Sequence, residues 1–178
     1  MEGLTFKYNK PKLSDEPING KVGCTLPSFG YSYQELKDNE ARASGRDLRV
    51  SYKEMVELLA AIRGLKLDKA RRLLEDVISL KRPIPFRRYV KGVGHRKQLQ
   101  GWKIGRYPVK AAKIMLKILK NVEYNATNKG LDAERLYIKH AAAHKGPKLR
   151  RFFPRAFGRA TPKIEQLVHV EIVVEERE

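Results

Sequence analysis

The chain has 178 residues, of which 42% are hydrophobic, and a formal net charge of +18. It is long enough to fold around its own core, and the charge, which opposes compaction by self-repulsion, predicts a polyanionic partner. Nucleic acid is the first candidate and an anionic membrane surface the second. No apolar run approaches the roughly 20 residues of a membrane-spanning helix, so we expect no membrane insertion.

The N-terminus, "MEGLTFKYNK", does not resemble a secretory signal. The one cysteine, Cys24, excludes an internal disulfide and a cysteine-rich zinc site. No histidine is near it in the sequence, so we interpret it as a buried or incidental thiol rather than a nucleophile. Together these features predict a soluble intracellular protein.

Residues 1–39 are predicted to form an irregular N-terminal extension, because Gly and Pro recur there and periodicity is weak. Its expected aromatic anchors are Phe29, Tyr31 and Tyr33. The regular domain is predicted to span residues 40–178. It opens with "ARASGRDLRV", which we interpret as a strand despite its poor alternation.

Apolar residues at helical spacing then predict three helices. The first opens at Ser51, where "SYKE" resembles a capping box with Glu54, and Gly64 is its expected stop. Asp68 is the expected cap of the second helix. We interpret both acids as caps rather than catalytic groups. The third helix is predicted to begin at Pro108, with one apolar stripe through Ala111, Ile114, Met115, Ile118 and Val122.

The window from Val77 to Val122 has thirteen Lys or Arg and no acidic residue. Its first part, residues 81–107, is predicted to be a long basic loop punctuated by Gly and Pro. On the third helix, four lysines form a narrow seam: Lys110, Lys113, Lys117 and Lys120. A lysine stripe is often only a solvated face. Helix surfaces usually mix charges of both signs, however, so the absence of acids favours phosphate contact.

Two strands are predicted near the C-terminus. "RLYIKHAAAH" places Leu136, Ile138, His140 and Ala142 on one face, and "EQLVHVEIVVEE" alternates Val168, Val170, Ile172 and Val174. Between them, residues 145–163 hold seven Lys or Arg, three Phe and no acid. Arg binds phosphates bidentately and Phe stacks on splayed bases, which indicates RNA binding. The alternative is a disordered basic loop.

The sequence shows no catalytic constellation, no metal site and no cofactor motif. "KGVGHRKQ" lacks the third Gly of a dinucleotide-binding loop. The histidines are His95, His140, His144 and His169, which we interpret as sheet-surface or RNA-facing groups rather than metal ligands. An RNA-processing enzyme and a free-standing nucleic-acid-binding regulator are the competing classes. The first would need a catalytic cluster, and the second a reading helix or a dimerisation stripe.

One stretch resembles a known family. In "GPKLRRFFPRAFGRATPKIEQLVHVEIVV" the fifteen-position pattern G-P-x-x-x-R-x-x-P-R-A-x-G-R-A is matched by Gly146, Pro147, Arg151, Pro154, Arg155, Ala156, Gly158, Arg159 and Ala160. It resembles the C-terminal hairpin of the large-subunit ribosomal protein numbered twenty-two in bacteria and seventeen in eukaryotes. The resemblance covers about residues 40–175, and the insert with "GHRKQLQGW" is similar to the archaeal or eukaryotic form.

The resemblance implies an α+β fold, with three helices packed on a three-stranded antiparallel sheet and a long extended hairpin at about residues 140–172. It implies a structural, non-enzymatic protein that binds large-subunit ribosomal RNA, with its body near the peptide exit. Arms of about 15 residues would reach roughly 50 Å from the body. The implied partners are that RNA, neighbouring large-subunit proteins and the nascent polypeptide. A tip of Arg155, Ala156, Phe157, Gly158 and Arg159 would line the tunnel constriction, and Gly158 would permit a tight turn.

The residues predicted to bind RNA are the basic, aromatic and histidine side chains of the loop, the seam and the hairpin. They are Arg87, Arg88, His95, Arg96, Lys97, Lys103, Arg106, Lys110, Lys113, Lys117, Lys120, Lys145, Lys148, Arg150, Arg151, Phe152, Phe153, Arg155, Arg159 and Lys163.

Overall fold

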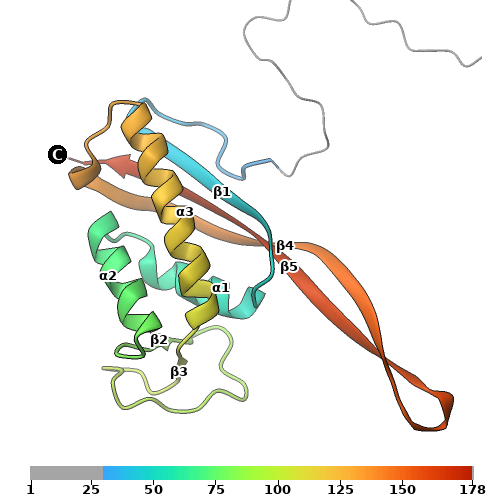
Figure 1. Cartoon of the computed structure of the whole chain (residues 1–178). Helices are drawn as coiled ribbons and strands as arrows, with labels where there is room; N and C mark the ends of the chain where they lie inside the picture. Colours follow the sequence, from blue (N-terminus) through green and yellow to red (C-terminus); the bar gives the residue numbers. More distant parts are fainter. Residues whose placement is uncertain (1–29, 178) are drawn as a thin grey trace, which may run out of the picture. The chain divides into compact units, whose positions relative to one another are not determined.

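A three-stranded antiparallel sheet and three helices make up the body (Figure 1). The structure is a computed structural model that describes residues 30–177, and residues from Tyr31 onward belong to one compact unit. The sheet has the strand order β1-β5-β4, and β2 pairs with β3 in a small second sheet. The predicted fold class is confirmed. The bounds are β1 (Glu40–Leu48), α1 (Tyr52–Ile62), α2 (Leu67–Ile78), β2 (Ile84–Pro85), β3 (Gly105–Arg106), α3 (Val109–Asn128), β4 (Leu136–Pro154) and β5 (Ala160–Glu176).

The core lies between the sheet and the helices. Helix α3 packs against β1 and α2, while α1 packs against β4. The predicted stripe of α3 is confirmed, since Ala111, Met115, Ile118 and Val122 are buried and Ile114 is half-buried. Among residues 30–177, no helix combines the length and the apolar character needed to cross a bilayer.

The helix ends differ from the predicted caps. Ser51 is the N-cap residue of α1, but its side chain makes no capping hydrogen bond, and Glu54 instead lies 3.9 Å from a guanidinium nitrogen of Arg106. Helix α2 begins one residue before Asp68, so this residue lies within the first turn and is not the N-cap. Its carboxylate still interacts favourably with the positive end of the helix dipole. Gly64 follows the end of α1 with φ +80°, which confirms the predicted stop.

A β-bulge changes the predicted faces of β4. Ile138 pairs with Val174 of β5, but His140 pairs with the next residue, Val173, so Lys139 is an extra residue in the strand. The alternation therefore shifts by one position, and Ala141 is fully buried in the core. The prediction that His140 and Ala142 share the face of Leu136 and Ile138 was wrong, because it assumed an uninterrupted strand.

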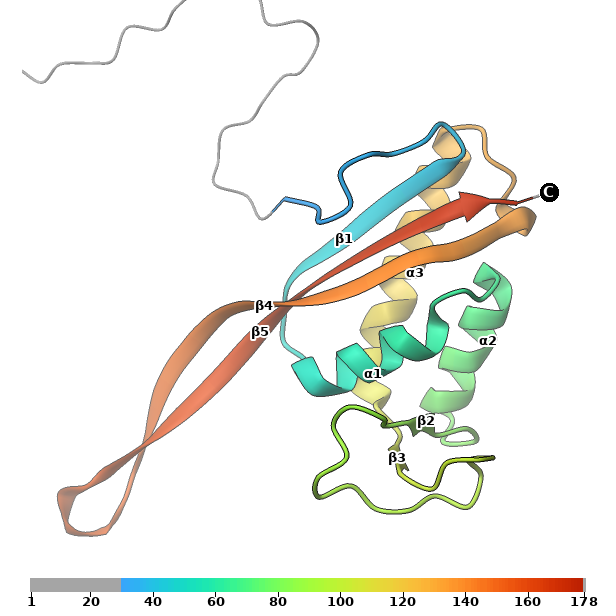
Figure 2. The same ribbon diagram turned by 180° about the vertical axis from the view of Figure 1, so that it is seen from behind.

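Strands β4 and β5 continue past the end of β1 as a two-stranded ribbon (Figures 1 and 2). The last β1 pair joins Leu48 to Val168, whereas pairing of β4 with β5 extends to Pro154 and Ala160. We call residues 146–166 the outer hairpin. Its β4 arm, residues 146–154, spans about 30 Å at roughly 3.3 Å per residue. The reach of roughly 50 Å was an overestimate, because the inner halves of both strands belong to the body.

The tip of the outer hairpin turns through a short 3-10 helix, Ala156–Gly158. Gly158 has φ +67°, as predicted, and Phe157 also has a positive φ of 56°. A left-handed conformation strains a residue with a β-carbon. The tip is therefore held in a tight turn that its own sequence only partly favours.

The face of the sheet opposite the helices carries the end of the N-terminal extension. Two of the predicted aromatic anchors contact it: the Arg42 guanidinium lies 4.2 Å from the centre of the Tyr31 ring, and Tyr33 stacks on His140 with ring centres 5.9 Å apart. The third predicted anchor, Phe29, lies outside the described residues, as does Cys24.

Candidate nucleic-acid interface

All twenty residues predicted to bind RNA have exposed side chains. The structure places them in three regions: the segment that joins α2 to α3, the outward side of α3, and the hairpin with its base at Lys145.

The basic loop is anchored to the body at its start. Ile84 and Phe86 are buried in the core, and Ile84 pairs with Arg106 in the small sheet. The buried carboxylate of Glu57 on α1 accepts hydrogen bonds from the backbone N–H groups of Arg87, Arg88 and Tyr89, at 3.1, 2.7 and 2.8 Å. This fixes the backbone of the loop while the two Arg side chains remain exposed. Sequence reasoning did not find this role of Glu57, whose only signal is an acid within the apolar string "MVELLAAI".

The lysine seam of α3 faces solvent. Lys110, Lys113, Lys117 and Lys120 are exposed, and within residues 30–177 none of them has a carboxylate within 4.0 Å. Glu123 follows the seam on the same helix, but its carboxylate pairs with Arg71 of α2. The seam therefore keeps its charge available to an external anion.

The outer hairpin brings cations and aromatic rings together. Arg151 and Lys163 are cross-strand partners, and the Lys163 ammonium lies 4.5 Å from the centre of the Phe153 ring. Phe157 at the tip is 94% exposed. The one acid in this segment, Glu165, lies 4.0 Å from Arg49 at the hairpin base. Rings that the protein's own core does not cover are suited to stacking on unpaired bases.

Arg106 alone of the twenty forms an ion pair among the described residues, with Glu54. It also donates a hydrogen bond to the Gly92 carbonyl at 3.1 Å. Arg106 therefore has a structural role in the loop as well as its exposed charge.

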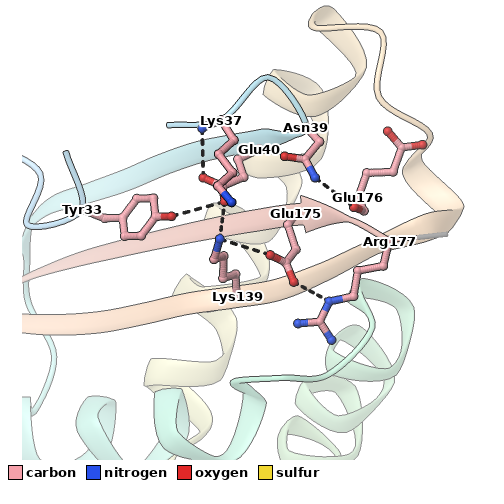
Figure 3. Close-up of polar contacts among 8 residues, drawn as sticks. All are labelled: Tyr33, Lys37, Asn39, Glu40, Lys139, Glu175, Glu176 and Arg177. Atoms are coloured by element: carbon pink, nitrogen blue, oxygen red, sulfur yellow. Dashed lines mark hydrogen bonds and ion pairs between the residues drawn. The ribbon is translucent and has the colours of Figure 1, made fainter. Parts of the chain in front are cut away.

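Three carboxylates are turned inward and are buried: Glu40, Glu57 and Glu171. Figure 3 shows Glu40 between the Lys139 ammonium, the Lys37 N–H at 3.2 Å and the Tyr33 hydroxyl at 3.3 Å. Burial opposes ionisation of Glu40, but the bonds from Lys139 and Lys37 outweigh it and lower the pKa below its ordinary 4.5. The bond to Glu40 is in turn the main cause of the raised pKa of Lys139.

Glu171 joins three parts of the chain on the same face of the sheet. It accepts hydrogen bonds from the backbone N–H and the hydroxyl of Ser32, and its Oε1 lies 3.2 Å from Nε2 of both His140 and His144. Burial acts to raise the pKa of Glu171, but the Ser32 amide and the two imidazoles lower it below its ordinary 4.5. The two histidines, interpreted from sequence as surface or RNA-facing groups, thus contact a buried carboxylate.

Within residues 30–177, no three His, Cys, Asp or Glu side chains are grouped as metal ligands. The described residues thus define a basic α+β protein whose exposed two-stranded arm presents cations and aromatic rings suited to nucleic acid. The chain belongs to the family described as Ribosomal protein L22p/L17e, whose model matches residues 43–175.

Three archaeal relatives, each named large ribosomal subunit protein uL22, are similar over most of their length. The protein of Staphylothermus marinus is 54% identical over 156 residues, which cover 85% of this chain and 99% of the relative. That of Archaeoglobus fulgidus is 53% identical over 153 residues, with the same two shares. That of Methanocaldococcus jannaschii is 51% identical over 146 residues, 82% of this chain and 94% of the relative.

The chain is therefore an archaeal-type structural protein of the ribosome, not an enzyme, and a cytoplasmic one. The family resemblance drawn from the hairpin motif is confirmed.

Proposed function

We propose that the chain binds large-subunit ribosomal RNA through the basic loop, the lysine seam and the outer hairpin. In this proposal the body lies near the peptide exit, the outer hairpin lines the nascent-peptide tunnel, and Arg155 to Arg159 form part of its constriction. Its partners are the RNA, neighbouring large-subunit proteins and the nascent polypeptide.

The observation that carries the proposal is the contrast between the outer hairpin and the body. From Arg150 to Ile164 every side chain is exposed, and three Phe and five Lys or Arg lie there without a carboxylate partner among the described residues. Such a segment gains nothing from a core of its own. It is instead suited to surroundings of phosphates and bases, which match its charges and its rings.

Two assays test the two halves of the proposal separately. Binding of the whole chain to large-subunit ribosomal RNA tests the first half, and absence of specific binding contradicts it. For the second half, a photoreactive residue replaces Phe157 in ribosomes that carry a stalled nascent chain, with Lys69 on the exposed side of α2 as the control position. We expect a cross-link to the nascent chain from position 157 and none from position 69. Ribosomes that contain the protein without a cross-link from position 157 contradict the tunnel assignment.

A further inference from the structure

A groove lies between α1, the end of α2 and two parts of the basic loop. Its volume is about 1170 Å³, above the roughly 300–1,000 Å³ of small-molecule pockets, so it has room for a segment of a polymer. Leu59 and Ile84, both buried, contribute to its apolar lining, and Trp102 lies on the side formed by the loop.

The groove is positively charged. Five cations line it: Arg63, Lys81, Arg82, Arg87 and Arg88. Two carboxylates, Glu57 and Asp76, line it as well, so the five cations outnumber the acids; both oxygens of Glu57 are also occupied by backbone N–H groups of the loop. Lys81, Arg82 and Arg87 are exposed and have no carboxylate within 4.0 Å among residues 30–177. An anionic occupant is therefore favoured.

Trp102 gives the groove a stacking surface. It is 37% exposed, and its Nε1 donates a hydrogen bond to the Phe86 carbonyl at 2.9 Å. This bond satisfies the polar edge of the indole and holds the ring on the loop side of the groove that the cations also line. The exposed Gln100 is a neighbouring lining residue, and its amide has no hydrogen-bond partner among the described residues. An amide carries both donors and acceptors, as the edge of a nucleobase does.

We propose that this groove binds an unpaired RNA segment, with one base stacked on Trp102 and the flanking phosphates held by Lys81, Arg82 and Arg87. The inference rests on the proposed binding of ribosomal RNA and names a site within it. An acidic peptide would also satisfy the cations. The groove combines an aromatic ring with guanidinium groups, and guanidinium groups bind phosphate bidentately. This combination favours a nucleotide, because the ring can stack on its base and the cations can bind its phosphate.

The chain offers a direct probe, because Trp102 is its one tryptophan. The whole chain is titrated with single-stranded oligoadenylate, with an RNA duplex of equal length and with polyglutamate, while tryptophan fluorescence is followed. Anisotropy of labelled RNA records binding independently. We expect the single strand to quench the fluorescence saturably, and the duplex and polyglutamate to leave it nearly unchanged.

Substitutions then test the contacts, with circular dichroism to verify folding. Arg82→Gln with Arg87→Gln should weaken the single-strand titration about tenfold or more, since hydrogen bonds to charged groups are involved. The control pair, Lys69→Gln with Arg72→Gln on α2, removes the same charge and should change the affinity for the single strand less than twofold. By anisotropy, Trp102→Ala should weaken binding about tenfold, whereas Trp102→Phe should largely retain it because stacking persists.

The outcomes separate this site from the general function. Binding of the single strand without quenching of the Trp102 fluorescence overturns the proposed groove site and leaves the proposed RNA binding intact. Equal quenching by polyglutamate also overturns it, in favour of an acidic peptide. Failure of the whole chain to bind large-subunit ribosomal RNA, which is the test of the proposed function, overturns both.

Discussion

Neutralising one cross-strand pair of the outer hairpin should lower the salt dependence of RNA binding by a defined amount. The pair is Arg151 on β4 and Lys163 on β5, which lie opposite each other. Both are exposed, and neither has a carboxylate within 4.0 Å among residues 30–177. Like charges directly opposite destabilise a strand pair, so Arg151→Gln with Lys163→Gln relieves repulsion and should not unfold the arm.

The magnitude follows from counterion release. Each phosphate contact contributes about 0.7 to 0.9 to the slope of log affinity against log salt concentration. If both residues hold phosphates, the double variant should reduce the slope by about 1.4 to 1.8. The matched control is Lys69→Gln with Arg72→Gln, two exposed cations of α2 that we do not assign to the interface. It removes the same charge and should change the slope by less than about 0.5.

The assay is filter binding of the whole chain to large-subunit ribosomal RNA over a series of monovalent salt concentrations. Equal changes of slope in the two double variants would refute the reasoning. The charges would then act only through the overall field of the protein, and the outer hairpin would make no phosphate contacts of its own.

Three further predictions concern the arm and the buried acids. Large subunits assembled with a chain that lacks residues 152–160 should retain the truncated protein but have a wider tunnel constriction by cryo-electron microscopy; unchanged width or failed incorporation counts against this. In the isolated protein, NMR order parameters over residues 148–162 should be lower than in α3, and equal values would show that strand pairing alone holds the arm. Because folding lowers the pKa of Glu40 and Glu171, their stabilisation is complete above the ordinary 4.5 and is lost as the pH falls through the folded pKa values. In denaturation at several pH values, Glu171→Gln should weaken this acid dependence, whereas the exposed Glu134→Gln should not.

The elements that depend on local periodicity could be predicted from the sequence. The stripe of α3 required only the spacing of Ala111, Met115, Ile118 and Val122, and all four are buried. The positive φ of Gly158 followed from a tight turn between two strands. These features are determined by neighbours within a few residues, so a single sequence contains most of the information.

Features set by distant partners could not be predicted in this way. The bulge at Lys139 depends on the register of β5 and on the bond of this lysine to Glu40 of β1. The prediction of a capping box was wrong because Glu54 pairs with Arg106, over fifty residues away along the chain. Glu57, Glu171 and Trp102 have ordinary sequence surroundings, and their roles appear only when the loop and the N-terminal extension fold back on the body.

The inward carboxylates bear on the order in which the protein could assemble with RNA. Glu40 and Glu171 accept hydrogen bonds from residues 32–37, and Glu57 accepts them from the start of the basic loop. The body thus contains its own counterions, placed where they tie its least regular segments to the sheet and to α1. The outer hairpin contains one acid, at its base. A body that carries its own anions can fold before any polyanion arrives, whereas the arm gains most of its counterions when RNA closes around it, so the architecture favours docking of a folded body followed by ordering of the arm.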